Sequence, residues 1–223
     1  MTAEIVFDSS TLISFSESCL VGALPFLKEK TGARFLITPE VRNEIVNRPL
    51  HVSAHAFSAL RLRRLIDERV LEVAEPPQGT AETLLSLANG LFVIKGGPVE
   101  IFQAGEAECV AFLAAGGADA IAVDEKTTRL LLEDPYKMLD KVRMEFRSKV
   151  DIDAEKLRQW RKLVGTATVM RSSELLAIAA EKGYLREFGS SQGEALHAAL
   201  FSLKSAGCSL TTKELGEYSQ VRI

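Results

Sequence analysis

The sequence predicts an α/β fold built around a parallel β-sheet. Short apolar runs that are typical of buried strands alternate along the chain with longer segments of helical periodicity. Strands that are joined by helices pair in parallel, because the helical crossover returns the chain to the same edge of the sheet. With 223 residues, the chain is long enough for one large domain, or for one domain with a small appendage.

The N-terminal third supplies the clearest element boundaries. Thr38 and Pro39 mark a helix start, because a hydroxyl side chain caps the first turn and proline fits the first helical position. The predicted elements are a strand at 5–7, helical spacing over 11–30, a strand at 35–37, a helix from 39, a helix at 53–67 and a strand at 70–74.

The rest of the chain repeats this alternation once and then departs from it. The segment 133–163 is highly charged and has helix-compatible apolar spacing, which predicts an inserted helical arm. We therefore divide the chain into a core at 1–132, a charged helical insertion at 133–163, and a last strand with C-terminal helices at 164–223 that complete the core or are appended to it. The predicted elements are helices at 80–92 and 105–115, a loop at 95–98, strands at 120–123 and 165–170, a helix at 172–182 capped by Ser172, and two helices within 190–220.

Composition excludes several classes of protein. The apolar content of 47% supports a packed core, and the charged content of 26% argues against disorder. No uncharged apolar run approaches the ~18 residues of a transmembrane helix. Glu4 and Asp8 lie where a signal peptide would be basic and then apolar, so we expect a cytoplasmic protein without membrane contact. Three cysteines, odd in number and far apart, match neither a zinc site nor a disulfide framework.

Charge is distributed unevenly along the chain. Residues 1–125 carry a net charge of −7, residues 126–165 carry +4, and residues 166–223 are neutral. An acidic segment followed by a basic one is what a metal-dependent phosphodiesterase would need. The acidic side chains bind the metal, and the basic side chains bind the phosphate backbone of the substrate. The alternative for the basic segment is a solvated helix face.

Five acidic residues stand at predicted strand ends or helix starts. Asp8 and Asp124 end predicted strands, Glu44 follows the second strand, and Glu106 and Glu108 open the helix after residue 105. The carboxyl ends of parallel strands meet at one edge of the sheet, where ligands bind. Converging carboxylates repel one another unless a cation lies between them, and hard oxygen ligands suit Mg²⁺ or Mn²⁺. The sequence therefore predicts a divalent metal site formed by these five residues.

Four short motifs together resemble those of PIN-domain nucleases. They are Asp8-Ser9-Ser10, the segment from Pro39 to Glu44, Gly105-Glu-Ala-Glu108, and Val123-Asp124-Glu125. The resemblance is closest to archaeal and bacterial PIN proteins, relatives of the VapC-type toxin ribonucleases, and it covers roughly residues 4–132. It implies a three-layer α/β/α sandwich, Mg²⁺ or Mn²⁺, and endonucleolytic cleavage of RNA, often by homodimers. A toxin of this kind would also bind a small antitoxin protein, whereas a processing enzyme would not need one.

The resemblance also implies roles for individual residues. The four catalytic acids would be Asp8, Glu44, Glu108 and Asp124, and Glu106 would share the metal with them. Three further residues would support the site: Ser10 beside the first acid, Glu125 where many relatives have a second aspartate, and Arg129, one helical turn later, where it could meet a phosphate.

Two other functions stay open at this point. The first is a PIN fold that binds RNA or protein without turnover, since the same acids can persist as a weak metal site. The second is a phosphohydrolase that forms an aspartyl-phosphate on Asp8. That chemistry usually has a second acid two residues after the first, where this chain has Ser10, so we rank it last.

Overall fold

The computed structural model describes residues 2–218 and is organised around a five-stranded parallel sheet. The strand order is β3-β2-β1-β6-β8, with the N-terminal strand at the centre. This confirms the predicted α/β class and parallel sheet. The strands are β1 (Glu4–Phe7), β2 (Arg34–Ile37), β3 (Leu71–Val73), β6 (Ala120–Ala122) and β8 (Val169–Met170).

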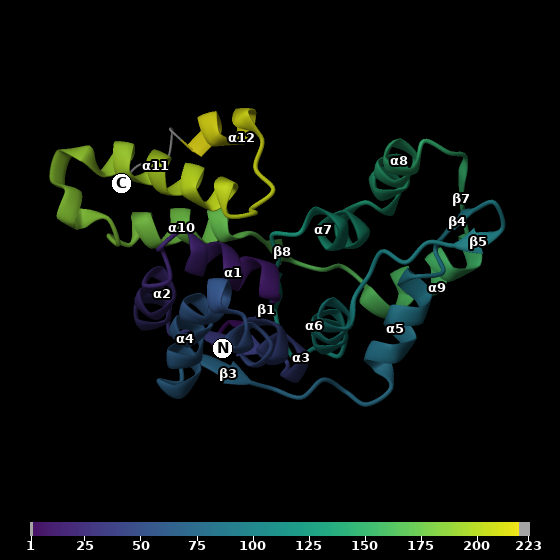
Figure 1. Cartoon of the computed structure of the whole chain (residues 1–223), viewed down its shortest axis with the longest axis horizontal. Helices are drawn as coiled ribbons and strands as arrows, with labels where there is room; N and C mark the ends of the chain where they lie inside the picture. The colour runs from purple at the N-terminus through teal and green to yellow at the C-terminus, as the bar shows by residue number, and fades with distance from the viewer. Residues whose placement is uncertain (1, 219–223) are drawn as a thin grey trace.

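Helices cover both faces of this sheet, which is consistent with a three-layer arrangement (Figure 1). One face carries α1 (Ser9–Glu17), α2 (Ala23–Thr31), α4 (Ser53–Asp67) and α10 (Ser172–Glu181), and the other carries α6 (Ala104–Ala114) and α7 (Lys126–Glu133). Right-handed crossovers from a central β1 produce this division. The core lies between the layers, where Phe7 of β1 and Phe35 of β2 pack with ring centroids 5.1 Å apart.

The segment after β2 begins as the sequence predicts and then changes its helical type. Thr38 caps α3 (Pro39–Arg42), and its hydroxyl accepts a hydrogen bond from the backbone N–H of Val41 at 3.4 Å. The helix then widens into a π-helical turn, η1 (Asn43–Asn47), followed by the 3₁₀ turn η2 (Pro49–His51). Turns of the π type are frequent at functional sites, and this one carries Glu44.

A second, antiparallel sheet was not predicted. It has the order β5-β4-β7, formed by β4 (Phe92–Ile94), β5 (Gly97–Pro98) and β7 (Val150–Ile152), and it packs with α5 (Thr80–Ala88), α8 (Pro135–Phe146) and α9 (Ala154–Val164). The purely helical interpretation of 133–163 is therefore wrong at β7, and the predicted helix at 80–92 ends at Ala88. Strands of three residues are too short to show alternation, so only their pairing reveals them.

The remaining chain returns to the main sheet and ends in helices. β8 pairs with β6, and α10 is followed by η3 (Arg186–Ser191), α11 (Gln192–Ser205) and α12 (Thr212–Glu217). The two helices predicted within 190–220 are α11 and α12, and positions 219–220 lie outside the described residues. The nearly buried Arg171 ties α12 to α10, since its guanidinium donates to Glu214 at 2.7 Å and to Glu174 at 2.6 Å.

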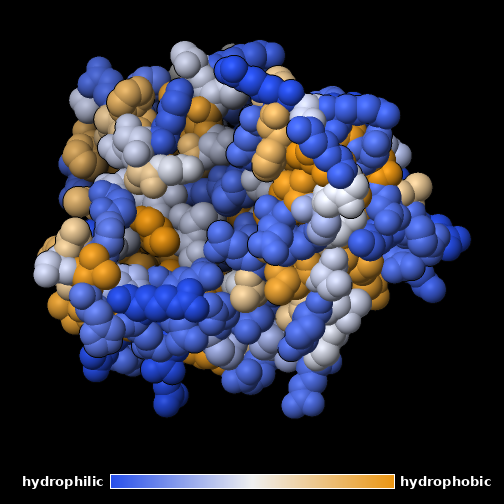
Figure 2. Space-filling model, turned by 45° about the vertical axis from the view of Figure 1, so that its right-hand side comes forward, coloured by the Kyte–Doolittle hydropathy of each residue, from blue (hydrophilic) through white to orange (hydrophobic). Residues whose placement is uncertain are grey.

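The surface is mainly hydrophilic. On the face shown in Figure 2, hydrophilic residues surround a depression near the middle, and hydrophobic residues show on both sides of it. The most exposed large apolar side chains include Met144 at 74%, Phe57 at 72% and Phe201 at 57%. Over residues 2–218, none of the helices has the length and apolar character that crossing a bilayer requires.

Candidate active site: a carboxylate cluster at the carboxyl edge of the sheet

Asp8 is a buried carboxylate with one unsatisfied oxygen. It follows β1, caps α1 and is only 2% exposed. Its Oδ2 atom accepts hydrogen bonds from the backbone N–H of Ser10 at 2.9 Å and from the Ser10 hydroxyl. Its Oδ1 atom is buried and has no partner among the described residues. Burial raises the pKa of Asp8, because an ionised carboxylate loses its hydration there. A cation at Oδ1 would compensate for that loss.

Ser10 joins the ends of two neighbouring strands. Its hydroxyl donates to Asp8, and its oxygen accepts hydrogen bonds from the backbone N–H groups of Asp124 at 3.0 Å and Glu125 at 3.2 Å. The hydroxyl is therefore fixed in direction by three partners. This arrangement orients the Asp8 carboxylate relative to the chain that follows β6.

Glu106 lies in the first turn of α6 and faces the same region. Its Oε2 atom accepts a hydrogen bond from the backbone N–H of Gln103 at 2.7 Å, and its Oε1 atom accepts one from the Thr128 hydroxyl. Burial and the charge of Asp8 raise the pKa of Glu106 to about 7, and the charge of Glu125 adds to the effect. These three acids are therefore close enough to repel one another.

Glu44 approaches Asp8 from the π-helical turn. Burial, and then the charge of Asp8, raise the pKa of Glu44, while a hydrogen bond with Ser9 opposes the shift. The approach depends on a glycine, because a Cβ atom added at Gly105 would lie 2.8 Å from Glu44 Oε1. Gly105 thus leaves room for this carboxylate beside the start of α6. We call Asp8, Glu44, Glu106 and Glu125 the carboxylate cluster.

Glu108 has a different partner. Its Oε2 atom accepts a hydrogen bond from the backbone N–H of Glu40 at 2.9 Å, in the first turn of α3. It therefore holds the helix that leads to Glu44. The sequence analysis chose Glu108 as the third acid and gave Glu106 a shared role. In the structure, Glu106 is the acid of α6 whose pKa responds to Asp8 and Glu125.

Asp124 is fully buried, and both of its oxygens are hydrogen-bonded. Oδ1 accepts from the backbone N–H of Ser172 at 2.7 Å and from the Thr11 hydroxyl at 3.5 Å, and Oδ2 accepts from the Ser172 hydroxyl at 2.7 Å. The register pairs Phe7 with Ala122, so Asp8 follows β1 by one residue and Asp124 follows β6 by two. These bonds fasten α10 to the chain that follows β6, and the role of Asp124 as a metal ligand stays a prediction.

Glu125 is the residue after β6 that adds its charge to the cluster. It caps α7, and its Oε2 atom accepts a hydrogen bond from the backbone N–H of Thr128 at 2.8 Å. Its charge contributes to the raised pKa values of Asp8 and Glu106. Glu125 was predicted to support the site and Asp124 to bind the metal. The charge of Glu125 acts on Asp8 and Glu106, and the roles of both acids toward a metal stay predictions.

Four hydroxyl residues around these acids were missed or misassigned: Ser9, Thr11, Thr128 and Ser172. The Thr128 hydroxyl donates to Glu106, which is 22 residues away, so no local pattern predicts this contact. Ser172 was predicted to cap α10, but Arg171 takes the cap position and Ser172 is the first helical residue. The contact of Thr11 with Asp124 spans 113 residues, and no local pattern announces it.

Two arginines border the cluster. Arg129, one turn after Glu125 on α7, has a buried Nε atom with no partner in the described part of the chain. Arg48 is exposed, pairs with Glu40 and lowers the pKa of Glu44. An unpaired guanidinium beside an acidic site is suited to binding a phosphate once a cation has balanced the acids.

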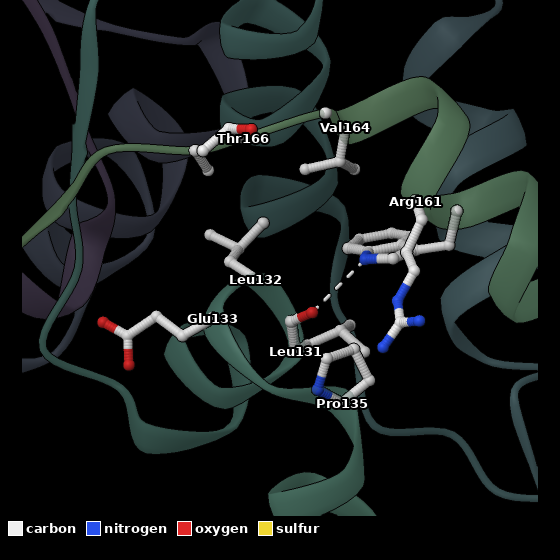
Figure 3. Close-up of a pocket in the computed structure, with 10 residues that line it drawn as sticks. Leu131, Leu132, Glu133, Pro135, Arg161, Val164 and Thr166 are labelled. Carbon is white, nitrogen blue, oxygen red and sulfur yellow. Dashed lines mark hydrogen bonds between the residues drawn. The ribbon is translucent and has the colours of Figure 1, made fainter.

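A separate hollow of about 470 Å³ lies at the other end of α7 (Figure 3). It lies between the end of α7, the start of α8 and the end of α9, where the Trp160 indole donates to the carbonyl oxygen of Leu131 at 3.3 Å. None of the predicted acids lines it. The carboxylate cluster, rather than this hollow, therefore holds the groups that can perform chemistry.

A divalent cation fits the cluster on chemical grounds. Within residues 2–218, no three His, Cys, Asp or Glu side chains are already arranged as a metal-binding group. The unpartnered Oδ1 atom of Asp8 and the raised pKa values of Asp8, Glu44 and Glu106 are the features that a cation would relieve. No protein family, curated protein or solved structure matches the chain. The function proposed below therefore follows from this geometry alone.

Proposed function

We propose that the protein is a divalent-metal-dependent endoribonuclease of the PIN type that hydrolyses RNA phosphodiester bonds at the carboxylate cluster. One observation carries the proposal: a buried aspartate with an unpartnered oxygen lies among three other acids at the carboxyl edge of a parallel sheet. Such a group is costly in free energy unless a cation binds there. Carboxylate oxygens favour Mg²⁺ or Mn²⁺.

The residues of the cluster divide the work. Asp8, Glu44, Glu106 and Glu125 would hold the cation, which when bound polarises a phosphoryl oxygen and lowers the pKa of a water molecule. Ser10 fixes the direction of the Asp8 carboxylate, and the nearby Arg129 meets the phosphate group of the substrate.

The nature of the substrate is supported by charge. Residues 126–165 carry a net charge of +4, and they begin directly after Glu125. A polyanionic strand bound along this segment would lead into the cluster. The homodimer, the small antitoxin partner and the cytoplasmic location expected from the sequence stay predictions.

The test is cleavage of labelled RNA by the purified protein with Mg²⁺ or Mn²⁺. We expect Asp8→Asn to lower the rate at least about 10³-fold, because an amide is a far weaker cation ligand and transition-state stabilisation by a metal is worth several kcal/mol. Asp119→Asn is the matched control, since Asp119 is exposed at the opposite edge of the same sheet and accepts only the N–H of Glu4. Equal cleavage by the unaltered protein and both variants would refute the assignment.

A second candidate is a PIN-type module that binds RNA or protein without turnover. The observation that favours it is Asp124, whose two oxygens are already occupied by Ser172 and Thr11, so that the fourth expected ligand is engaged elsewhere. RNA binding that is unchanged in Asp8→Asn, with no cleavage at any divalent metal, would select this candidate over the nuclease.

A further inference from the structure

One stripe of α1 leads from the carboxylate cluster to an apolar hollow. Ser9, Ile13 and Glu17 are spaced four residues apart, so they lie on the same side of the helix. Ser9 follows Asp8 of the cluster directly, and its side chain is close enough to Glu44 to lower the pKa of that carboxyl. Ile13 and Glu17 line a hollow of about 200 Å³. Four residues rise about 6 Å along a helix, so Ile13 lies about 6 Å along α1 from Ser9.

The opposite wall of the hollow also continues from the cluster. Ile45 follows Glu44 directly in η1, and it lines the hollow together with residues of α4. Apolar residues supply most of the lining, namely Ile13, Ile45, Pro49, Ala59 and Leu62, and the polar ones are Glu17, His55 and Ser58. Apolar walls with a few polar groups are typical of sites that enclose a ring system and read its edge.

We propose that this hollow binds one nucleobase of the substrate strand, next to the nucleotide whose phosphate lies at the cluster. The inference rests on the proposed function, since it places the hollow along the path of the RNA. The separation of about 6 Å corresponds to one or two nucleotides, because stacked nucleotides rise about 3.4 Å each. A volume of about 200 Å³ lies below the roughly 300 Å³ at which sites for larger ligands begin, so it suits a single base.

The polar groups determine which nucleobases we expect the hollow to prefer. A carboxylate such as Glu17 accepts hydrogen bonds and cannot donate them at neutral pH, so it favours bases that present an amino group. Bases with an exocyclic amino group are therefore preferred over uracil at this position. Glu17 and His55 are both exposed, which leaves their polar ends free to meet a base that enters from solvent.

The experiment measures binding of fluorescent single-stranded RNA by anisotropy, with Mg²⁺ present and with phosphorothioate linkages that resist hydrolysis, so that cleavage does not interfere. Each nucleotide of the oligomer is replaced in turn by an abasic unit. We expect one position at which loss of the base weakens binding by about tenfold, as is typical for one enclosed base. In the Ile13→Ser variant, we expect the same abasic substitution to weaken RNA binding no further, because the contact between Ile13 and the base is already lost. Leu163→Ser is the control, since Leu163 is similarly exposed, at 41% against 37%, but lies on α9.

A second variant keeps the test independent of the stability of α1. Glu17→Gln replaces an exposed side chain, and we expect it to reduce the preference over uracil at the coupled position at least threefold while total affinity changes little. If no abasic position couples to Ile13, or if both variants behave as the Leu163→Ser control does, the subsite is refuted. That result leaves the nuclease proposal standing, because cleavage is measured separately. Coupling without cleavage would keep the subsite and refute the nuclease.

Discussion

Asp8 and Asp124 end neighbouring parallel strands, yet their surroundings are opposite. Both are buried aspartates next to a serine-rich helix start. The fold supplies donors to both oxygens of Asp124, whereas Oδ1 of Asp8 is left without a donor among the described residues. A strand-end position therefore marks a candidate acid, whereas the number of its partners decides whether it is available for chemistry.

The comparison predicts opposite effects of the same substitution on stability. Asp124→Asn replaces an acceptor with an amide whose NH₂ group faces the donors of Ser172, and we expect a loss of about 3 kcal/mol in the free energy of unfolding. Asp8→Asn removes a poorly compensated buried charge, so we expect the metal-free protein to be unchanged or more stable. Urea unfolding of both variants in EDTA measures the difference.

Equal losses of unfolding free energy in the two variants would contradict this difference, because they would show that the oxygens of Asp8 have hydrogen-bond partners as complete as those of Asp124. The unaltered protein should in addition be stabilised by Mg²⁺ or Mn²⁺ in the same assay, whereas Asp8→Asn should not. A ligand that binds only the folded state raises the free energy of unfolding by RT ln(1 + L/Kd), where L is the free ligand concentration, so the effect grows with that concentration.

The second prediction concerns pH and is somewhat smaller. The pKa of Glu106 is about 7 in the folded protein against 4.5 for an ordinary glutamate. The folded state therefore binds the proton more tightly, and the stability from this group is complete below about pH 4.5 and is lost as the pH rises through 7. In metal-free protein, Glu106→Gln should recover about 2–3 kcal/mol at pH 8 and little at pH 4.

Glu100→Gln provides the control for Glu106, since Glu100 is an exposed glutamate outside the cluster. It should leave the pH dependence of unfolding unchanged. If the two variants show parallel curves between pH 4 and 8, Glu106 is not close to the other acids, and the cluster must be redrawn without it.

The smallest predicted effect tests the hydroxyl that supports Glu106. Thr128→Val keeps the shape of the buried side chain and removes the donor to Glu106 Oε1. We expect a loss of about 1 kcal/mol in stability, typical of one hydrogen bond, and a rise in the pKa of Glu106, since the bond stabilises its charged form. NMR titration of Glu106 would detect the rise, and a pKa that stays the same or falls would contradict the geometry.

Much of the fold could be predicted because its signals are local. The strand at 5–7, the cap at Thr38 and the helix at 53–67 all agree with the structure within a residue or two. Each depends on a short apolar run, a capping hydroxyl or a periodic stripe, and these patterns act over one to four turns of helix or a few residues of strand. The edge of the sheet that gathers Asp8, Glu44 and Glu106 follows from the parallel order alone.

The remaining features depend on contacts between distant residues. β4 and β7 pair Val93 with Asp151, and no three-residue run shows in advance which partner it will find. Asp124 looked equivalent to Asp8 because its donors come from Thr11 and Ser172, which are 113 and 48 residues away. The hydrogen bond of Glu108 could not be predicted for a similar reason, since the N–H of Glu40 that it accepts belongs to a different crossover.

β1 lies at the centre of the sheet, so the order of synthesis determines when its neighbouring strands are present. β1 leaves the ribosome first, but its neighbour β6 begins at Ala120, and Thr128 is needed to hold Glu106. Asp8 and Glu44 are thus synthesised long before the acids that complete their surroundings. A nascent chain that ends before Glu125 contains only part of the cluster, so premature termination before this position yields a fragment without an assembled site.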